Sequence, residues 1–164
     1  MAFMDTEIAS SSSVTHGWKY DVFLSFRGTD TRTKFTDHLY AALKQKGIFT
    51  FRDDEELERG TIISSELMKA IEESRFAVVI LSSNYASSSW CLTELAKIIE
   101  CKEKTGLRVL PVFHYVDPSD VRNKRGTFAE ASAKHKERFQ EDVDTWRAAL
   151  EQVASIAGFD LRDQ

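Results

Sequence analysis

The chain has 164 residues, of which 42% are hydrophobic and 29% charged, and its 26 acidic side chains outnumber its 22 Lys and Arg side chains to give a net charge of −4. This length suits one domain with its own hydrophobic core, because compact domains cluster at about 100–150 residues. An acidic balance argues against a protein that holds nucleic acid on a broad basic face. Seven glycines and two prolines are too few for a turn-rich β-sandwich, so we expect a helix-rich globular fold.

The two cysteines, Cys91 and Cys101, lie in one helical pattern and match neither a zinc motif nor a disulfide framework. The N-terminal segment has no basic start and no apolar run of signal-peptide length, and no stretch approaches the about 18 apolar residues of a membrane span. We therefore expect a soluble domain without metal or membrane contact, in the cytoplasm and also in the nucleus.

The chain up to residue 60 predicts a leader, two strands and one helix. The serine run at 10–13 indicates a disordered leader at 1–18, ahead of a folded domain at 19–161 and a tail at 162–164. Apolar runs predict strands at 20–26 and 48–51. A helix is expected at 31–46, ending at Gly47, because four apolar residues share one face: Phe35, Leu39, Ala42 and Leu43. The charged loop at 52–60 lacks calcium-binding spacing and is better explained as a partner contact.

The rest of the chain repeats the alternation of helix and strand. Helices are expected from Ser64 or Ser65 to Ser74, at 90–104, at 128–139 and in a last segment that includes Trp146. Strands are expected at 76–81, which is apolar on both faces, and at 109–113, which Pro111 places toward an edge. A fifth strand is less legible, with 156–161 as its candidate. The side chains expected to point inward from these helices are Ile63, Leu67, Ala70, Ile71, Cys91, Leu95, Ile98, Ile99, Val143, Trp146, Leu150, Val153 and Ala157.

This alternation predicts an α/β fold with a parallel sheet covered by helices on both faces. Ligands of such sheets bind outside the carboxyl ends of the strands, which here means the loops after Phe26, Phe51, Ser82 and His114. No dinucleotide fingerprint, Walker loop, serine-nucleophile elbow or zinc-protease motif is present in the sequence. Hydride transfer, phosphoryl transfer and serine–histidine chemistry are therefore unsupported.

Two polar groupings lie in the predicted loops. Residues 27–32 combine two arginines, hydroxyls and Gly28 before a helix, which suits a phosphate but also an ordinary helix cap. Trp90 and Glu94 lie four apart on one helix, so their side chains are neighbours. They could form an aromatic wall beside a functional carboxylate, or simply a rim tryptophan beside a solvated glutamate. A basic loop at 122–125 follows Asp117 and Pro118.

Five blocks of the sequence, in order, resemble a plant Toll/interleukin-1 receptor (TIR) domain, as found at the N-terminus of nucleotide-binding leucine-rich-repeat immune receptors. They are YDVFLSFRGTDTR at 20–32, FTDHLYAAL at 35–43, FRDDEELERG at 51–60, AIEESRFAVVILSSNYASSSWCLTEL at 70–95 and LPVFHYVDPSDVR at 110–122. The resemblance implies a flavodoxin-like fold and a self-association-dependent NAD(P) nucleosidase of plant innate immunity and cell death. Such an enzyme releases nicotinamide and ADP-ribose or cyclic ADP-ribose-type signals. It takes NAD or NADP as substrate and uses no separate cofactor and no metal.

The same resemblance assigns roles to residues of this chain. The catalytic glutamate falls at Glu94, and the substrate-binding positions are Arg27, Gly28, Thr29, Asp30, Thr31, Arg32, Gly60, Thr61, Ser88 and Trp90. One contact between copies corresponds to Asp37 and His38 on the first helix, where the family pattern has serine in place of Asp37. A second lies around Gly158.

Two other functions remain open at the level of sequence. A catalytically silent adaptor would signal through TIR–TIR contacts alone, although Glu94 is present. A synthetase that makes cyclic nucleotides from nucleic acid is disfavoured by the acidic balance, with the basic loop at 122–125 as the feature in its favour.

Overall fold

The computed structural model describes residues 18–52 and 65–162, and its centre is a parallel sheet of five strands. In spatial order these are β2 (Thr50–Arg52), β1 (Tyr20–Ser25), β3 (Ser74–Leu81), β4 (Arg108–Phe113) and β5 (Phe159–Asp160). Every neighbouring pair is parallel. The predicted α/β class is confirmed, and the fifth strand lies inside its candidate segment.

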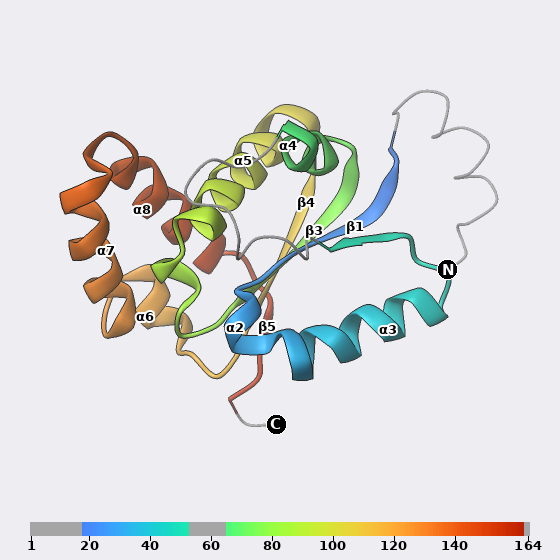
Figure 1. Cartoon of the computed structure of the whole chain (residues 1–164), viewed down its shortest axis with the longest axis horizontal. Coiled ribbons are helices and arrows are strands. Elements are labelled where there is room, and N and C mark those ends of the chain that lie inside the picture. Colours follow the sequence, from blue (N-terminus) through green and yellow to red (C-terminus); the bar gives the residue numbers. More distant parts are fainter. Residues whose placement is uncertain (1–17, 53–64, 163–164) are drawn as a thin grey trace.

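The connections are mostly helical. The described helices are α2 (Gly28–Thr31), the π-helix η1 (Arg32–Thr36), α3 (Asp37–Gln45), α4 (Ser65–Glu72), the 3-10 turn η3 (Tyr85–Ser87), α5 (Ser89–Thr105), α6 (Pro118–Arg122), α7 (Thr127–Arg138) and α8 (Gln140–Ala154). Figure 1 shows α3 on one side of the sheet and α4 and α5 on the other, with α7 and α8 beside α5. The single helix expected at 31–46 is therefore a succession of α2, η1 and α3.

The basic segment expected as a loop at 122–125 begins inside α6. Asp117 caps that helix, because its Oδ1 accepts a hydrogen bond of 2.9 Å from the Ser119 backbone N–H, and Pro118 occupies the first turn, where its missing N–H is harmless. The Asp-Pro pair thus begins a helix.

The main core lies between the sheet and α4, α5, α7 and α8. From the sheet it contains Phe23, Ala77, Val79 and Leu81. The predicted inward positions are confirmed for Leu67, Ala70, Ile71, Cys91, Leu95, Ile98, Ile99, Val143, Trp146, Leu150 and Val153, all of which are buried. Ala157 was predicted wrongly, because α8 ends at Ala154 and Ala157 is exposed. Ile63 lies outside the described residues.

A smaller core lies under α3. Phe35, Leu39 and Leu43 are half-buried and pack against a cluster on the opposite sheet face that includes Leu24 and Ile80. Ala42 is exposed, so its predicted place on this face was wrong, and Tyr40 packs there instead. The apolar face of this segment therefore follows the i, i+4, i+8 positions, and the Tyr40 side chain lies beside that row.

Pro111 marks a close approach between β4 and the segment before β5. β4 lies between β3 and β5, but β5 pairs only with Val112 and Phe113. The part of β4 that precedes Val112, which includes Pro111, is therefore at the edge of the sheet, as expected. A Cβ atom at Gly158 would lie 2.1 Å from the Pro111 carbonyl oxygen. Glycine is therefore the residue that lets the chain reach the sheet here.

We expect Gly158→Ala to lower the free energy of unfolding by about 1–3 kcal/mol, because the added methyl group forces the backbone around Pro111 to shift. Urea denaturation followed by tryptophan fluorescence measures this. The matched control is Ala157→Ser at the exposed neighbour, expected within about 0.5 kcal/mol of wild type. Equal stability of Gly158→Ala and wild type would contradict the argument.

Candidate active site

The candidate site lies at the carboxyl edge of the sheet, where the segments after β1 and β3 meet. β1 ends at Ser25 and leads into α2 at Gly28, while β3 leads through η3 into α5. Because β1 and β3 are adjacent and parallel, their carboxyl ends deliver these segments to one place.

Glu94 on α5 is the centre of the site. Its side chain is only 2% exposed. The Ser25 hydroxyl donates to Oε1 at 2.8 Å, and the Trp90 indole N–H donates to Oε2 at 3.1 Å. A buried carboxylate requires such donors, because burial removes the water that would otherwise solvate it. The site is therefore a carboxylate oriented from two sides.

The Ser25 hydroxyl is in turn held by Tyr85. The two hydroxyl oxygens lie 2.7 Å apart, and both side chains are 0% exposed. Since Ser25 has one hydroxyl hydrogen and gives it to Glu94, the Tyr85 O–H donates to Ser25. Tyr85 Oη also lies 3.3 Å from the Cys91 carbonyl oxygen. The result is a chain of hydrogen bonds from η3 through β1 to α5.

Trp90 and Glu94 are neighbours on α5, as the spacing predicts. The alternative of a rim tryptophan beside a solvated glutamate is wrong, because Trp90 is 4% exposed and belongs to the main core. Packing fixes the indole, so its N–H direction is fixed as well. Trp90 thus orients the carboxylate in this structure.

The start of α5 is fastened to the end of β1. The Ser88 hydroxyl caps α5 by accepting from the Cys91 backbone N–H at 3.0 Å. The Cys91 thiol, 0% exposed, lies 3.5 Å from the Phe26 carbonyl oxygen and donates to it. These contacts hold the first turns of α5 against the segment that carries Arg27.

Asp30 joins the same two segments nearer the surface. Its carboxylate accepts from the Ser82 hydroxyl, from the Asn84 backbone N–H at 3.0 Å and from the Asn84 side-chain amide at 3.3 Å. In this structure Asp30 therefore links α2 to the segment after β3.

His114 directly follows β4, at the same carboxyl edge of the sheet. Its ring packs 5.4 Å from Phe35 and 4.8 Å from Tyr115, measured between ring centroids. Burial lowers the pKa of His114, and the Asp30 carboxylate opposes that shift by favouring the protonated ring. The imidazole is therefore harder to protonate here than in the unfolded chain.

The structure brings together part of the predicted site. Gly28 is buried and Arg27 half-buried beside the end of β1, close in sequence to Ser25. Thr29 and Thr31 lie in α2 and Arg32 begins η1, and only their backbone is described. Gly60 and Thr61 lie outside the described residues.

The predicted self-association residues lie elsewhere. Asp37 begins α3 and forms an ion pair of 2.6 Å with Arg52 of β2, while His38 is exposed. Gly158 directly precedes β5, the edge strand beside β4, and lies against Pro111.

Sequence reasoning missed Ser25 and Tyr85. Ser25 is a buried polar residue that directly follows the apolar run Val22–Leu24, which is a signal that it needs a buried partner. Its partners Tyr85 and Glu94 lie 60 and 69 residues further along the chain, so only the fold reveals the pairing.

Within residues 18–52 and 65–162 no three His, Cys, Asp or Glu side chains gather in a way that could hold a metal ion. No helix in the same ranges combines the length and the apolar character needed to cross a bilayer.

Residues 19–164 match the family model for the TIR domain. The chain belongs to the TIR family. It is 53% identical over 159 residues to the TMV resistance protein N of Nicotiana glutinosa, covering 94% of this chain and 14% of that protein. It is 51% identical over 162 residues to the disease resistance protein RPV1 of Vitis rotundifolia, covering 99% of this chain and 12% of that protein. This TIR chain therefore spans about an eighth of the length of these relatives.

A comparison with solved structures supports the same family assignment. The TIR domains of the activated Roq1 resistosome, which directly recognises the pathogen effector XopQ, match with a TM-score of 0.82 and 57% identity, covering 89% of this chain and 90% of that one. A metazoan TIR-STING receptor from C. gigas shares the fold alone, with a TM-score of 0.51 and 16% identity over 82% of this chain and 41% of that one. The resemblance to plant TIR domains is confirmed.

We expect Ser25→Ala to lower the free energy of unfolding by about 1–3 kcal/mol, because Tyr85 and Glu94 stay buried after losing a partner. Combined with Tyr85→Phe, the two losses should fall short of additivity by about 0.5 kcal/mol or more, as expected of residues in one network. Urea denaturation of the four proteins gives the coupling. Strictly additive losses would argue against the hydrogen-bond chain. Ser155→Ala, which removes an exposed hydroxyl, is the control and should change stability by less than about 0.5 kcal/mol.

The lowered pKa of His114 predicts a pH dependence of stability. The unfolded chain binds the proton more readily than the folded one, so stability present above about pH 6.5 is lost as pH falls through the pKa of the folded state. Between about pH 7.5 and about pH 5.5 the wild type should lose more stability than His114→Gln. Chemical denaturation at both pH values measures the difference, and parallel profiles would contradict it.

Proposed function

We propose that this TIR domain cleaves the nicotinamide glycosidic bond of NAD or NADP when copies of it associate, and that the products signal in plant immunity. The observation that carries the proposal is the oriented, buried carboxylate of Glu94 at the carboxyl edge of the sheet. The sequence resemblance assigns the family's catalytic glutamate to this residue. The names of the relatives, which are disease resistance proteins, support the biological setting.

The chemistry needs one carboxylate. The nicotinamide ring of NAD is a cation, and when the bond between its nitrogen and the ribose C1′ breaks, the ring takes the electron pair and leaves as a neutral base. No general acid is required, unlike the two-carboxylate arrangement of most glycosidases. A water molecule then forms the new bond to C1′ and releases a proton to solvent. Glu94 would stabilise the positive charge that develops on the sugar and bind its hydroxyls.

Burial of Glu94 links this chemistry to association. At 2% exposure the carboxylate accepts from Ser25 and Trp90, and a substrate hydroxyl would have to reach the same oxygens. Contacts between copies that move the segments around α2 would open that approach. His38, which is exposed on α3, would lie in one such contact, and the region of Gly158 in another.

The burial of Glu94 also favours a second candidate function. A carboxylate with a purely structural role would be held in the same way, and the domain would then be a silent adaptor that signals through TIR–TIR contacts alone. Nicotinamide release separates the two functions, because an adaptor shows none even when assembled.

We expect Glu94→Gln to reduce nicotinamide release from NAD by about 100-fold or more, because the amide cannot stabilise a developing cation as a carboxylate does. Release is followed by chromatography at low and high protein concentration, with folding checked by thermal unfolding. Glu100→Gln on the same helix is the matched control, because its exposed carboxylate forms a surface ion pair with Lys104. Unchanged turnover in Glu94→Gln would refute the assignment.

We expect His38→Ala to lower nicotinamide release by about tenfold at low protein concentration, because the substitution weakens association. At high protein concentration the activity of the variant should recover, because Glu94 is intact. Light scattering at matched concentrations measures assembly. Lys69→Ala, an exposed change on the opposite side of the sheet, should have no effect on either readout. Activity independent of concentration in all three proteins would rule out control by assembly.

A further inference from the structure

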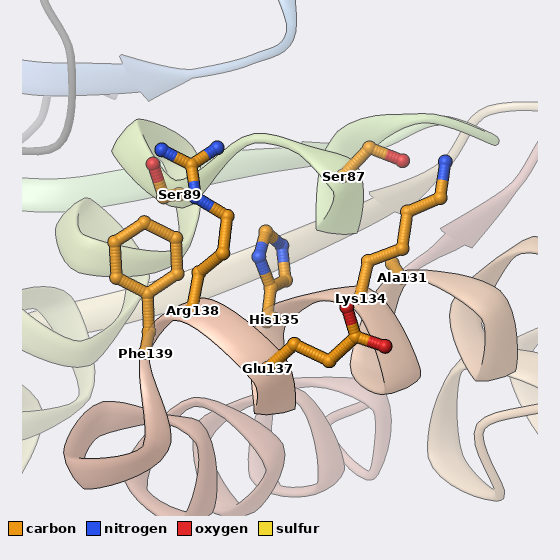
Figure 2. Close-up of a pocket in the computed structure, with 8 residues that line it drawn as sticks. All are labelled: Ser87, Ser89, Ala131, Lys134, His135, Glu137, Arg138 and Phe139. Atoms are coloured by element: carbon orange, nitrogen blue, oxygen red, sulfur yellow. The ribbon is translucent and has the colours of Figure 1, made fainter.

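A pocket lies away from Glu94, between α7 and the start of α5. Its volume is about 440 Å³, within the range of about 300–1,000 Å³ that is usual for small-molecule sites. Its lining residues are Ser87, Ser89, Ala131, Lys134, His135, Glu137, Arg138 and Phe139, so neither Glu94 nor its donors line it. Figure 2 shows the His135 ring between the side chains of Arg138 and Lys134.

His135 is the buried polar group of this pocket. It is 8% exposed, and its Nε2 lies 2.8 Å from the Ala86 carbonyl oxygen. A carbonyl only accepts, so Nε2 carries the hydrogen and the neutral ring has its lone pair on Nδ1. Among the described residues Nδ1 has no hydrogen-bond partner. Trp146 holds the ring edge-on at 5.3 Å between centroids, which fixes the direction of Nδ1.

The rest of the lining favours an anion. Lys134 and Arg138 are exposed and, within residues 18–52 and 65–162, neither forms an ion pair. Glu137 offsets one of these two positive charges, which leaves one in excess. Ser87 and Ser89 add hydroxyl groups, and Ser89 is the first residue of the 17-residue helix α5, whose amino end attracts negative charge.

We infer that this pocket binds a phosphorylated ribonucleoside. The phosphate would lie between Arg138, Lys134 and the amino end of α5. There the guanidinium group of Arg138 and the ammonium group of Lys134 would donate to its oxygens. A hydroxyl or amino group of the nucleoside would donate to His135 Nδ1, and Glu137 would accept from a ribose hydroxyl. Ala131 and Phe139 supply apolar wall for the base. The inference is independent of the proposed NAD cleavage, since it uses none of the same side chains.

The test measures binding of AMP to the whole chain by isothermal titration calorimetry, with adenosine and inorganic phosphate as partial ligands. AMP should bind at least about tenfold more tightly than either partial ligand, because only AMP reaches both the cations and His135. The double variant Lys134→Ala, Arg138→Ala should weaken AMP binding by about tenfold or more. Both side chains are exposed, so folding should be unaffected.

Two controls locate the binding. Lys136→Ala removes one positive charge from an exposed position of α7 that does not line the pocket, and should change AMP affinity by less than about twofold. Glu94→Gln should leave AMP binding intact even where it abolishes nicotinamide release, so the two proposals fail separately. The second site is overturned if wild type does not bind AMP or if Lys136→Ala weakens binding as much as the double variant does. It is equally overturned if binding is lost in Glu94→Gln and kept in the double variant, or if phosphate alone binds as tightly as AMP.

Discussion

A carboxylate buried at the carboxyl edge of a parallel sheet is the constraint around which this domain is arranged. Glu94 is almost fully enclosed, and an enclosed charge is tolerated only where donors replace water. That requirement explains a serine at the end of an apolar strand and a tryptophan one helical turn before the glutamate. It also explains the tyrosine in η3, whose hydroxyl supports the serine. Each group is part of the solvation of one side chain.

The same edge is tied together a second time by Asp30. Its bonds to Ser82 and Asn84 connect α2 to the segment before η3, while Cys91 connects the start of α5 to the residue that follows β1. Both links cross between chain segments more than 50 residues apart in sequence. The region is thus closed by a small number of polar contacts, each of which exchanges readily for water or for a ligand, whereas the core beneath it is apolar and fixed.

The sequence predicts the framework well because apolar runs and helical faces are local patterns. The run at 76–81 is apolar on both faces and proves to be part of the central strand β3, and the spacing of Trp90 and Glu94 correctly makes them neighbours. The π-helix at 32–36 is not encoded in any such pattern, so one helix was expected where three succeed one another. The partnership of Ser25 with Tyr85 depends on how β1 and β3 lie together, which no local window contains.

Two positions that fit a helical pattern, Ala42 and Ala157, are exposed in the structure. Ala42 fits a helical stripe but is exposed, whereas Tyr40, with the Arg52 guanidinium 4.2 Å from its ring centroid, packs against the smaller core from the flank of that stripe. Ala157 fits the period of α8, but the helix ends before it so that the chain can turn at Gly158 and reach β4. The close approach of Gly158 to Pro111 is a long-range contact that the helical period does not contain.

The Cys91 thiol gives the domain a built-in reporter of its own opening. It is 0% exposed and rests against the Phe26 carbonyl, three residues along α5 from Glu94, so a movement that separated α5 from the segment after β1 would uncover the sulfur. Cys101, on the same helix but away from the site, has a thiol pKa raised by burial and serves as an internal reference. Faster alkylation of Cys91 relative to Cys101 would therefore report separation of α5 from the segment after β1, without a substrate.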